Sequence, residues 1–261
     1  MGADIIDYKI LGDDLQAVII TLDPGEAVVA EAGAMLYLDP DIEMATQLSM
    51  KSGGGGVLGK LFEAGKRAVT GESFFITYFA NEGRVRRDCA FAAPYPGKVI
   101  PLELAEHQGE IICQKDSFLC AARGIEIGIA LQRKLGVGLF GGEGFILQRL
   151  TAPKGNGQAF LHAGGTIIER TLQRGETLRV DTGCLVAFEK SVGYDIQFVK
   201  GIKNKLFGGE GLFYAALSGP GKVWVQTLPF SRLADRIIVT SNSNKGEGSV
   251  LGGVFNMIDG R

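Results

Sequence analysis

The hexapeptide LFGGEG occupies residues 139–144 and recurs without change at residues 206–211. A weaker copy, TGESFF, occupies residues 70–75. Each copy leads into a short run of aromatic and aliphatic residues, and such residues are enriched in β-strands. A glycine-rich turn before a strand, found at three places along the chain, indicates a repeated β unit.

Two further motifs repeat in step with the first. One is a Gly-Glu turn before a strand, found as PGEAVV at 24–29, GEIIC at 109–113 and GETLRV at 175–180. The other is a turn glycine directly before a strand, at Gly97, Gly157 and Gly221. Because the three motifs keep one order, we expect three copies of a unit of about 66 residues.

The units are predicted at residues 1–100, 101–164 and 165–230, followed by a C-terminal segment of flexible character at residues 231–261. The first unit is longer because it carries a glycine-rich insertion around Gly53–Gly56. Most segments are short, rich in Val, Ile, Thr and Phe, and bounded by Gly, Pro or Asp. The sequence therefore predicts an all-β protein of three tandem sandwich or barrel modules.

Helical periodicity is weak along the whole chain. The best candidates are Val57–Val69, Ile127–Leu135 and Phe230–Arg236. We therefore expect few short helices, with one in the first module and one near the C-terminal end.

The composition fits a folded core and excludes several classes of protein. Hydrophobic residues make up 46% and charged residues 21%, whereas 39 of 261 residues are glycine, about twice the ordinary share. Only 8 prolines are present, without glycine at every third position, which excludes collagen. The net charge of −2 makes nucleic-acid binding an unfavoured function. An acidic N-terminus and the lack of a long apolar run predict a cytoplasmic protein without a transmembrane segment.

Cysteine and histidine usage argues against metal chemistry and predicts no cofactor. The four cysteines, Cys89, Cys113, Cys120 and Cys184, contain no Cys-x-x-Cys pair, so we expect reduced and mostly buried thiols. Only two histidines occur, too few for a cupin-type centre that takes three. Of these, His162 lies in an alternating segment and is predicted to be a satisfied structural residue.

Motifs for catalysis are incomplete or absent. The stretch GGGVLGKL at residues 54–61 matches a phosphate-binding loop, but Leu61 stands where a Ser or Thr would hold Mg²⁺. A glycine hairpin is the better interpretation, because an all-β module lacks the parallel sheet that such a loop requires. No nucleophile elbow is present, so no catalytic residue is predicted and the protein is not expected to be an enzyme.

The repeated acids Glu72, Glu143 and Glu210 are the candidate ligand-binding residues. Clustered carboxylates could bind a cation or perform acid–base work if the units bring them together. Alternatively, each carboxylate could accept backbone N–H bonds from its own glycine turn, which explains the repetition equally well.

Four motifs resemble the altered-inheritance-of-mitochondria family, whose bacterial members form a domain family of unknown function. They are TGESFF at 70–75, GLFGGEGF at 138–145, FLHAGG at 160–165 and LSGPGKVWVQTLP at 217–229. The resemblance implies three tandem modules like the trp RNA-binding attenuation protein, a short double-stranded β-helix variety of sandwich. It also implies a homotrimer that forms a ring with pseudo-ninefold symmetry, and it supplies no catalytic residue. The mitochondrial members are associated with inner-membrane organisation.

Three hypotheses for function follow. The first is a non-enzymatic oligomeric β-ring that acts as a scaffold or assembly platform for unknown protein partners. The second is a ring that binds RNA or a small ligand, by analogy of fold alone. The third is a cupin-like metalloenzyme, which the histidine count disfavours.

Overall fold

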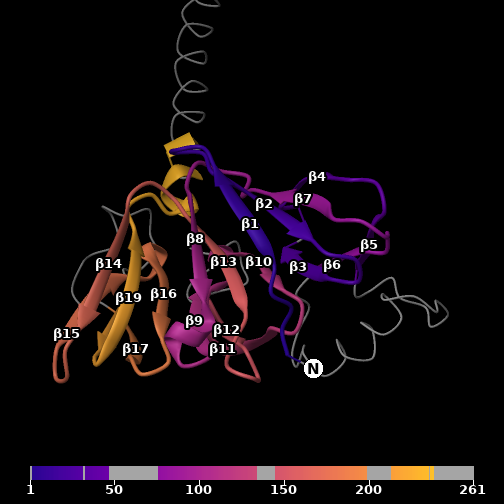
Figure 1. Ribbon diagram of the computed structural model, residues 1–261. Helices are drawn as coiled ribbons and strands as arrows, with labels where there is room; N and C mark the ends of the chain where they lie inside the picture. The colour runs from indigo at the N-terminus through magenta and orange to yellow at the C-terminus, as the bar shows by residue number, and fades with distance from the viewer. Residues whose placement is uncertain are drawn as a thin grey trace, which may run out of the picture.

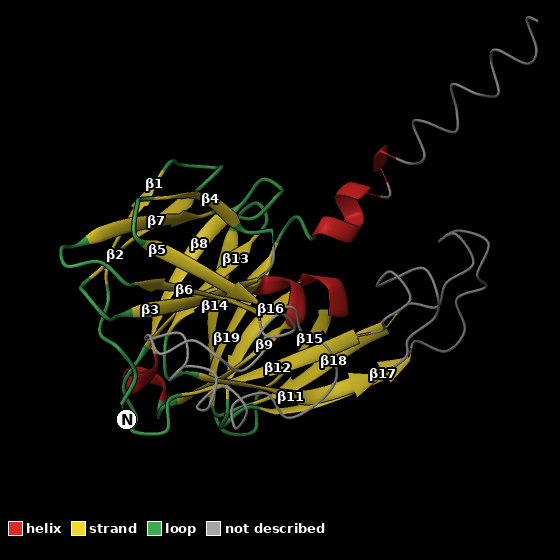
Figure 2. Ribbon diagram, turned by 90° about the vertical axis from the view of Figure 1, so that its right-hand side faces the viewer, coloured by secondary structure: helices red, strands yellow, loops and turns green. Residues whose placement is uncertain are grey.

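Nineteen strands in four sheets make up the described part of the chain. The computed structural model describes residues 2–31, 33–46, 76–133, 145–198, 213–234 and 236–237 (Figure 1). Strands dominate this part, and the helical segments are short (Figure 2). They include the 3-10 turns η1 (Leu104–His107), η2 (Lys115–Ser117) and η3 (Thr182–Cys184). The prediction of an all-β protein is confirmed.

The strands form the four sheets in the following orders. The first sheet is β1 (Asp7–Leu11), β2 (Ala17–Leu22), β7 (Arg87–Phe91) and β4 (Met35–Leu38). The second is β5 (Ile42–Thr46), β6 (Ile76–Asn81), β3 (Ala27–Glu31), β10 (Phe118–Ala122), β13 (Gln158–Ala163) and β8 (Lys98–Glu103). The third is β11 (Glu126–Arg133), β12 (Phe145–Thr151), β9 (Glu110–Gln114), β16 (Leu185–Glu189), β19 (Gly221–Gln226) and β14 (Ile167–Leu172). The fourth is β15 (Thr177–Asp181), β18 (Phe213–Ser218) and β17 (Gly193–Phe198).

The strand order of the second sheet recurs in the third, with each strand six places later in the chain. The first and fourth sheets each contain one half of the same order: β4, β7 and β2 correspond to β10, β13 and β8, and β15, β18 and β17 correspond to β9, β12 and β11. The two halves of a six-stranded sheet join through the antiparallel pairs β3–β10 and β9–β16. Neighbouring sets of strands along the chain therefore share a continuous sheet.

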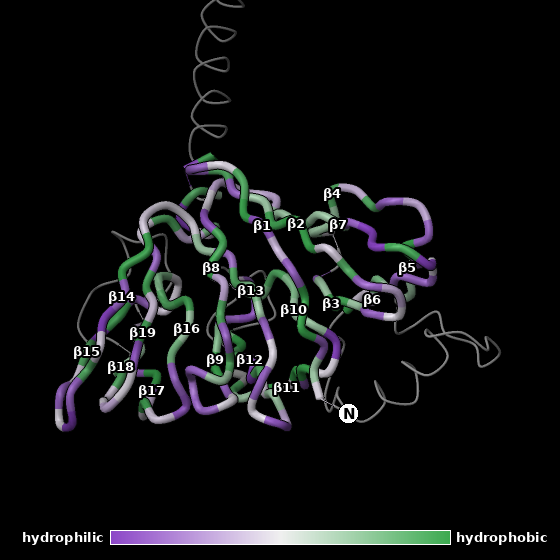
Figure 3. Tube along the Cα trace, viewed as in Figure 1, coloured by the Kyte–Doolittle hydropathy of each residue, from purple (hydrophilic) through white to green (hydrophobic). Residues whose placement is uncertain are grey.

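In the described residues, three large hydrophobic cores lie between the four sheets, one at each interface. Strand β3 shows how one strand serves two cores, because its side chains alternate between the faces of the sheet. Val28 and Ala30 pack toward the first sheet, whereas Val29 packs toward the third. The two central sheets bury both faces in this way, and hydrophilic residues gather in the turns at the strand ends (Figure 3).

The Gly-Glu motif forms a closed turn in the first and third sets of strands. Gly25 and Gly175 have φ angles of 87° and 84°, which glycine adopts without strain. In each turn the glutamate donates its backbone N–H to the carbonyl three residues earlier, and its carboxylate accepts the N–H of that same residue. The carboxylate distances are 2.8 Å for Glu26 and 2.9 Å for Glu176. These glutamates thus stabilise the turn that leads into β3 or β15.

The third motif does not mark equivalent positions. Gly157 and Gly221 lie at the start of β13 and β19, which hold the same place in their sheets. Gly97 instead precedes β8, which corresponds to β2 and β14. The expected unit boundary at residue 100 therefore falls inside β8, because a turn glycine before a strand carries no information on which strand follows it.

The three helix candidates have different outcomes. The prediction of a helix at Ile127–Leu135 is wrong, because its described part belongs to β11, where seven residue pairs with β12 override the local helix propensity. Residues 230–234 and 236–237 are helical, as predicted. The segment Val57–Val69 lies outside the described residues. No helix in the described ranges is long and apolar enough to span a membrane.

Candidate functional site

The repeated acids Glu72, Glu143 and Glu210 lie outside the described residues, as does the insertion Gly53–Gly56. Within the described ranges, no three His, Cys, Asp or Glu side chains are grouped so that they could hold a metal ion. The features that stand out instead are two sheet edges, β4 at one end of the molecule and β15 at the other (Figure 1).

Strand β4 corresponds residue by residue to β10 and β16. Each of the three strands pairs with its neighbour through the same irregularity, a bulge that skips one residue. Met35 lies opposite Phe91 and Tyr37 opposite Ala90, with Leu36 between them in the bulge. The matching triplets are Phe118, Leu119 and Cys120 in β10, and Leu185, Val186 and Ala187 in β16.

Exposure of these matched residues differs sharply between the three strands. In β10 and β16, which are covered by β3 and β9, all six side chains are at most 3% exposed. In β4, Met35 is 40%, Leu36 55% and Tyr37 44% exposed. No described strand pairs with the outer edge of β4. Three consecutive apolar residues on an unpaired edge are unusual, since such edges invite association with another strand.

Strand β15 is the complementary edge at the other end of the chain. Its counterparts β3 and β9 each have two neighbours, whereas β15 pairs only with β18 among the described strands. Val180 and Leu178 pack into the third core, and Thr177 and Arg179 are exposed. Strand β3 pairs with β10 through one of its edges, and β9 pairs with β16 in the same way. No described strand pairs with the corresponding edge of β15.

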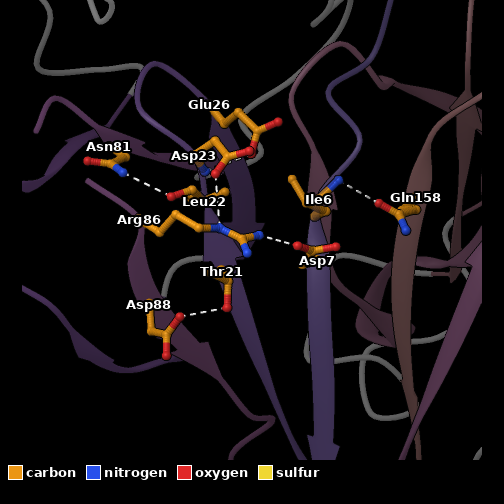
Figure 4. A network of polar contacts seen from close by, with 10 residues as sticks. All are labelled: Ile6, Asp7, Thr21, Leu22, Asp23, Glu26, Asn81, Arg86, Asp88 and Gln158. Atoms are coloured by element: carbon orange, nitrogen blue, oxygen red, sulfur yellow. Dashed lines mark hydrogen bonds and ion pairs between the residues drawn. The ribbon is translucent and has the colours of Figure 1, made fainter. Parts of the chain in front are cut away.

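The N-terminal segment covers the other side of the first sheet. Strand β1 pairs with β2, and Arg86 bridges Asp7 of β1 and Asp23, with 2.9 Å to the latter (Figure 4). The backbone N–H of Ile6 donates to Gln158 Oε1 of the second sheet at 2.9 Å. Strand β1 thus extends the sheet beyond β2, whereas β4 is the end of the sheet that corresponds to the strands β10 and β16 at the internal junctions.

The two junctions inside the chain carry charged contacts at the ends of the paired strands. At the β9–β16 junction, His107 Nδ1 donates to Glu189 Oε1 at 2.9 Å, and both side chains are largely buried. The other carboxylate oxygen of Glu189 accepts the backbone N–H of Lys222 at 3.0 Å. At the β3–β10 junction, Arg123 pairs with Asp4 at 2.8 Å and donates its backbone N–H to the Ala27 carbonyl at 2.9 Å.

The contacts of His107 are those of a structural residue. Its ring packs edge-on against Trp224 with 5.4 Å between centroids, and the Trp224 Nε1–H donates to Glu169 at 3.1 Å. No Ser, Cys or Thr nucleophile is among these contacts. Sequence reasoning did not single out the pair of His107 and Glu189, because 82 residues separate them.

His162 is buried, but its Nδ1 has no hydrogen-bond partner among the described residues. The ring packs edge-on against Tyr95 at 4.5 Å and lies so close to Gly97 that a Cβ there would overlap it. Burial lowers the pKa of His162 to about 4, because the charged form loses its hydration. The expectation of a satisfied histidine is therefore wrong in one respect, since packing and not an Nδ1 hydrogen bond holds the ring.

The prediction of reduced, mostly buried cysteines is confirmed. All four are free and buried. Burial raises the pKa of each thiol, to about 12 for Cys89. Such thiols are poor nucleophiles and poor metal ligands near neutral pH.

These features define a class of all-β proteins in which consecutive sets of strands share sheets and the terminal sets leave two complementary edges. The sequence pattern of the mitochondrial biogenesis AIM24 family matches residues 8–228, and the chain belongs to this family. An uncharacterised protein of Streptococcus pyogenes serotype M6 is 31% identical over 216 residues, which are 82% of each chain. The X-ray crystal structure of a Streptococcus pyogenes protein superposes with a TM-score of 0.69 at 22% identity, covering 90% of this chain and 100% of the other. That likeness supports the fold.

Proposed function

We propose that the protein is a non-enzymatic scaffold whose chains assemble edge to edge into a closed ring. In this ring β15 of one chain pairs with β4 of the next, as β3 pairs with β10 and β9 with β16 inside the chain. The observation that carries the proposal is the exposure of Met35, Leu36 and Tyr37, whose counterparts are at most 3% exposed at both internal junctions. A contact between two different edges repeats head to tail and generates a ring when the rotation closes.

A ring of three chains with nine sets of strands is what membership of the family implies, if its modules are like those of the trp RNA-binding attenuation protein. Burying Met35, Leu36 and Tyr37 contributes about 1 kcal/mol each, because roughly half of each side chain is still exposed in one chain. Backbone hydrogen bonds along the paired edges add to this, and the pairing removes two edges that would otherwise promote aggregation. The lack of a nucleophile–base pair in the described contacts of His107 supports the non-enzymatic part of the proposal.

Light scattering of the purified chain tests the assembly. We expect a mass three times that of the chain, and a shift toward the monomer in Leu36→Lys, which places a charge in the proposed interface. Met44→Lys is the matched control, because Met44 is also 55% exposed but belongs to β5, a strand of the second sheet that takes no part in the proposed pairing. A monomeric wild-type protein, or equal effects of both substitutions, would contradict the ring.

A further inference from the structure

The two junctions inside the chain share one pairing register. At the first, Cys120 lies opposite Ala30 and Ala121 opposite Val29. At the second, Ala187 lies opposite Cys113 and Phe188 opposite Ile112. Cys120 and Ala187 are the matched residues that follow the bulge in β10 and β16. The same position of the strand therefore lies opposite the neighbouring strand at both junctions.

Strand β15 can be placed on β3 and β9 by its own hydrogen bonds. The carbonyls of Glu26, Gly109 and Glu176 each accept a backbone N–H at the C-terminal end of the paired strand, at 3.0, 2.8 and 3.0 Å. The donors are Asn81, the last residue of β6, and Ala152 and Gly219, which directly follow β12 and β18. Counting along the strand from these carbonyls, Val180 takes the place of Ala30 and Cys113. The structural match therefore aligns Gly109 with the glutamates, one residue away from the match suggested by the glycines of the motif.

From this alignment we infer that the chains join with Tyr37 opposite Val180 and Leu38 opposite Arg179, and that Asp39 of one chain meets Arg174 of the next. The inference rests on the proposed function and specifies its interface. Tyr37 matches Cys120 of β10 and Ala187 of β16. Val180 matches Ala30 and Cys113, the residues that lie opposite these two at the internal junctions. A one-residue slip would turn every side chain to the opposite face, so the alternation of core residues selects this register.

The charged contact follows from the second junction. Glu189 ends β16 and meets His107, which directly precedes Gln108, a residue in the left-handed conformation with φ 57°. Asp39 holds the place of Glu189 after β4. Arg174 directly precedes the left-handed Gly175 and is exposed. Asp39 and Arg174 thus occupy the positions that Glu189 and His107 occupy at the β9–β16 junction.

Asp39 is held in place for this contact. Its Oδ2 accepts the Asp88 backbone N–H at 2.9 Å, and its own N–H donates to the Asp88 carbonyl at 2.9 Å. The side chain is therefore fixed at the end of the β4 edge, with one carboxylate oxygen not used by this contact. Exposed ion pairs contribute little to affinity, but an incorrect register would place Asp39 and Arg174 away from each other and leave them unpaired.

Disulfide trapping in the full-length chain tests the register. The double variant Tyr37→Cys with Val180→Cys should form covalent trimers when oxidised with diamide, and either single variant should not. The substitutions are mild, since the fold already has cysteine at the matched positions Cys120 and Cys113. The control pair is Tyr37→Cys with Thr177→Cys, which is three residues, or about 10 Å, out of register and beyond disulfide reach.

The outcomes separate the register from the ring. Covalent trimers from the first pair alone support the inference. A trimeric mass without this cross-link, or with cross-links from the control pair, overturns the register and leaves the ring in place. A monomeric mass for the wild-type chain overturns both.

Charge substitutions test the contact between Asp39 and Arg174 without cysteine. Arg174→Glu should raise the dissociation constant of the assembly by roughly 2- to 5-fold per contact at low salt, whereas Arg174→Lys should retain it. Asp39→Lys combined with Arg174→Glu should restore assembly relative to Arg174→Glu alone. The same loss in both Arg174 variants, or no rescue by the reversed pair, would overturn the contact.

Discussion

Replacing His162 should remove a pH-dependent loss of stability that the wild-type protein shows between about pH 6.5 and pH 4. The histidine is 2% exposed, its Nδ1 has no hydrogen-bond partner in the part of the chain that the structure describes, and Tyr95 packs against the ring. Burial lowers the pKa of His162 to about 4, against about 6.5 in the unfolded chain. Because the unfolded state binds the proton at higher pH, stability is full above pH 6.5 and falls as the pH decreases toward 4.

The difference between the two pKa values corresponds to about 3 kcal/mol at most. The assay is urea unfolding at fixed protein concentration, at several pH values from 8 to 4, for wild type and His162→Phe. Since all other titrating groups are shared, the difference between the two free energies of unfolding isolates His162. This difference should change by about 2–3 kcal/mol across the window, with the variant gaining relative to wild type at low pH.

Two curves that stay parallel from pH 8 to pH 4 would refute the reasoning. A constant offset between them would not, because the larger Phe ring changes packing near Gly97 independently of pH. His162→Leu provides a second neutral side chain if the Phe variant unfolds under all conditions. Both variants should show the same relative gain at low pH.

Three other predictions concern turns, close packing and thiols. Glu176→Ala should lower the free energy of unfolding by about 1 kcal/mol, since the Gln173 N–H loses its carboxylate acceptor, and Glu176→Gln should retain most of it; urea unfolding measures both. Gly164→Ala should cost about 2 kcal/mol or more and lower Tm, because its Cβ would overlap the Leu228 carbonyl, whereas Gly128→Ala meets no neighbour and should change stability by less than about 0.5 kcal/mol. The native protein should not react with a thiol reagent such as DTNB, and four thiols should react after unfolding; rapid reaction of the native protein would contradict the burial of the cysteines.

The sequence carried enough information to predict an all-β fold, and the Gly-Glu turns show why. Gly25 and Gly175 require positive φ angles and their glutamates close the turn, so these features depend on residues within a few positions of each other. The order of strands in the sheets depends on contacts between distant residues. Gly97 illustrates the limit, since its turn resembles that at Gly157 although the two precede strands with different places in a sheet.

Candidate functional residues were harder to predict for the same reason. Repetition directed attention to Glu72, Glu143 and Glu210, whereas the β4 edge is notable only by comparison with β10 and β16 in three dimensions. In the sequence, Met35, Leu36 and Tyr37 form an ordinary strand segment. Their significance comes from the lack of a described strand on the outer edge of β4, and a local pattern does not show which strands have a neighbour on each side.

The β15 edge differs from its internal counterparts β3 and β9 because it carries a charged residue in the middle of the strand, and this charge affects which strands can pair with the edge. At the two internal junctions the middle residue of the covering strand is Val29 or Ile112, at most 4% exposed, whereas β15 has the exposed Arg179. The guanidinium group of Arg179 lies over the Tyr214 ring of its own sheet, 5.4 Å from the centroid. A charge on an edge strand opposes pairing with an arbitrary hydrophobic strand, because the charged group would have to lose its hydration.

In the proposed ring, the apolar contribution to the interface between chains therefore comes mainly from β4, and β15 supplies the polar selectivity. An edge that was apolar on both sides would pair as readily out of register as in register, and chains would then grow into open filaments as well as closed rings. The combination of Arg179 and Arg174 on β15 and its preceding turn with Asp39 at the end of β4 favours a single arrangement. The internal junctions need no such selection, since the covalent chain already fixes which strands meet.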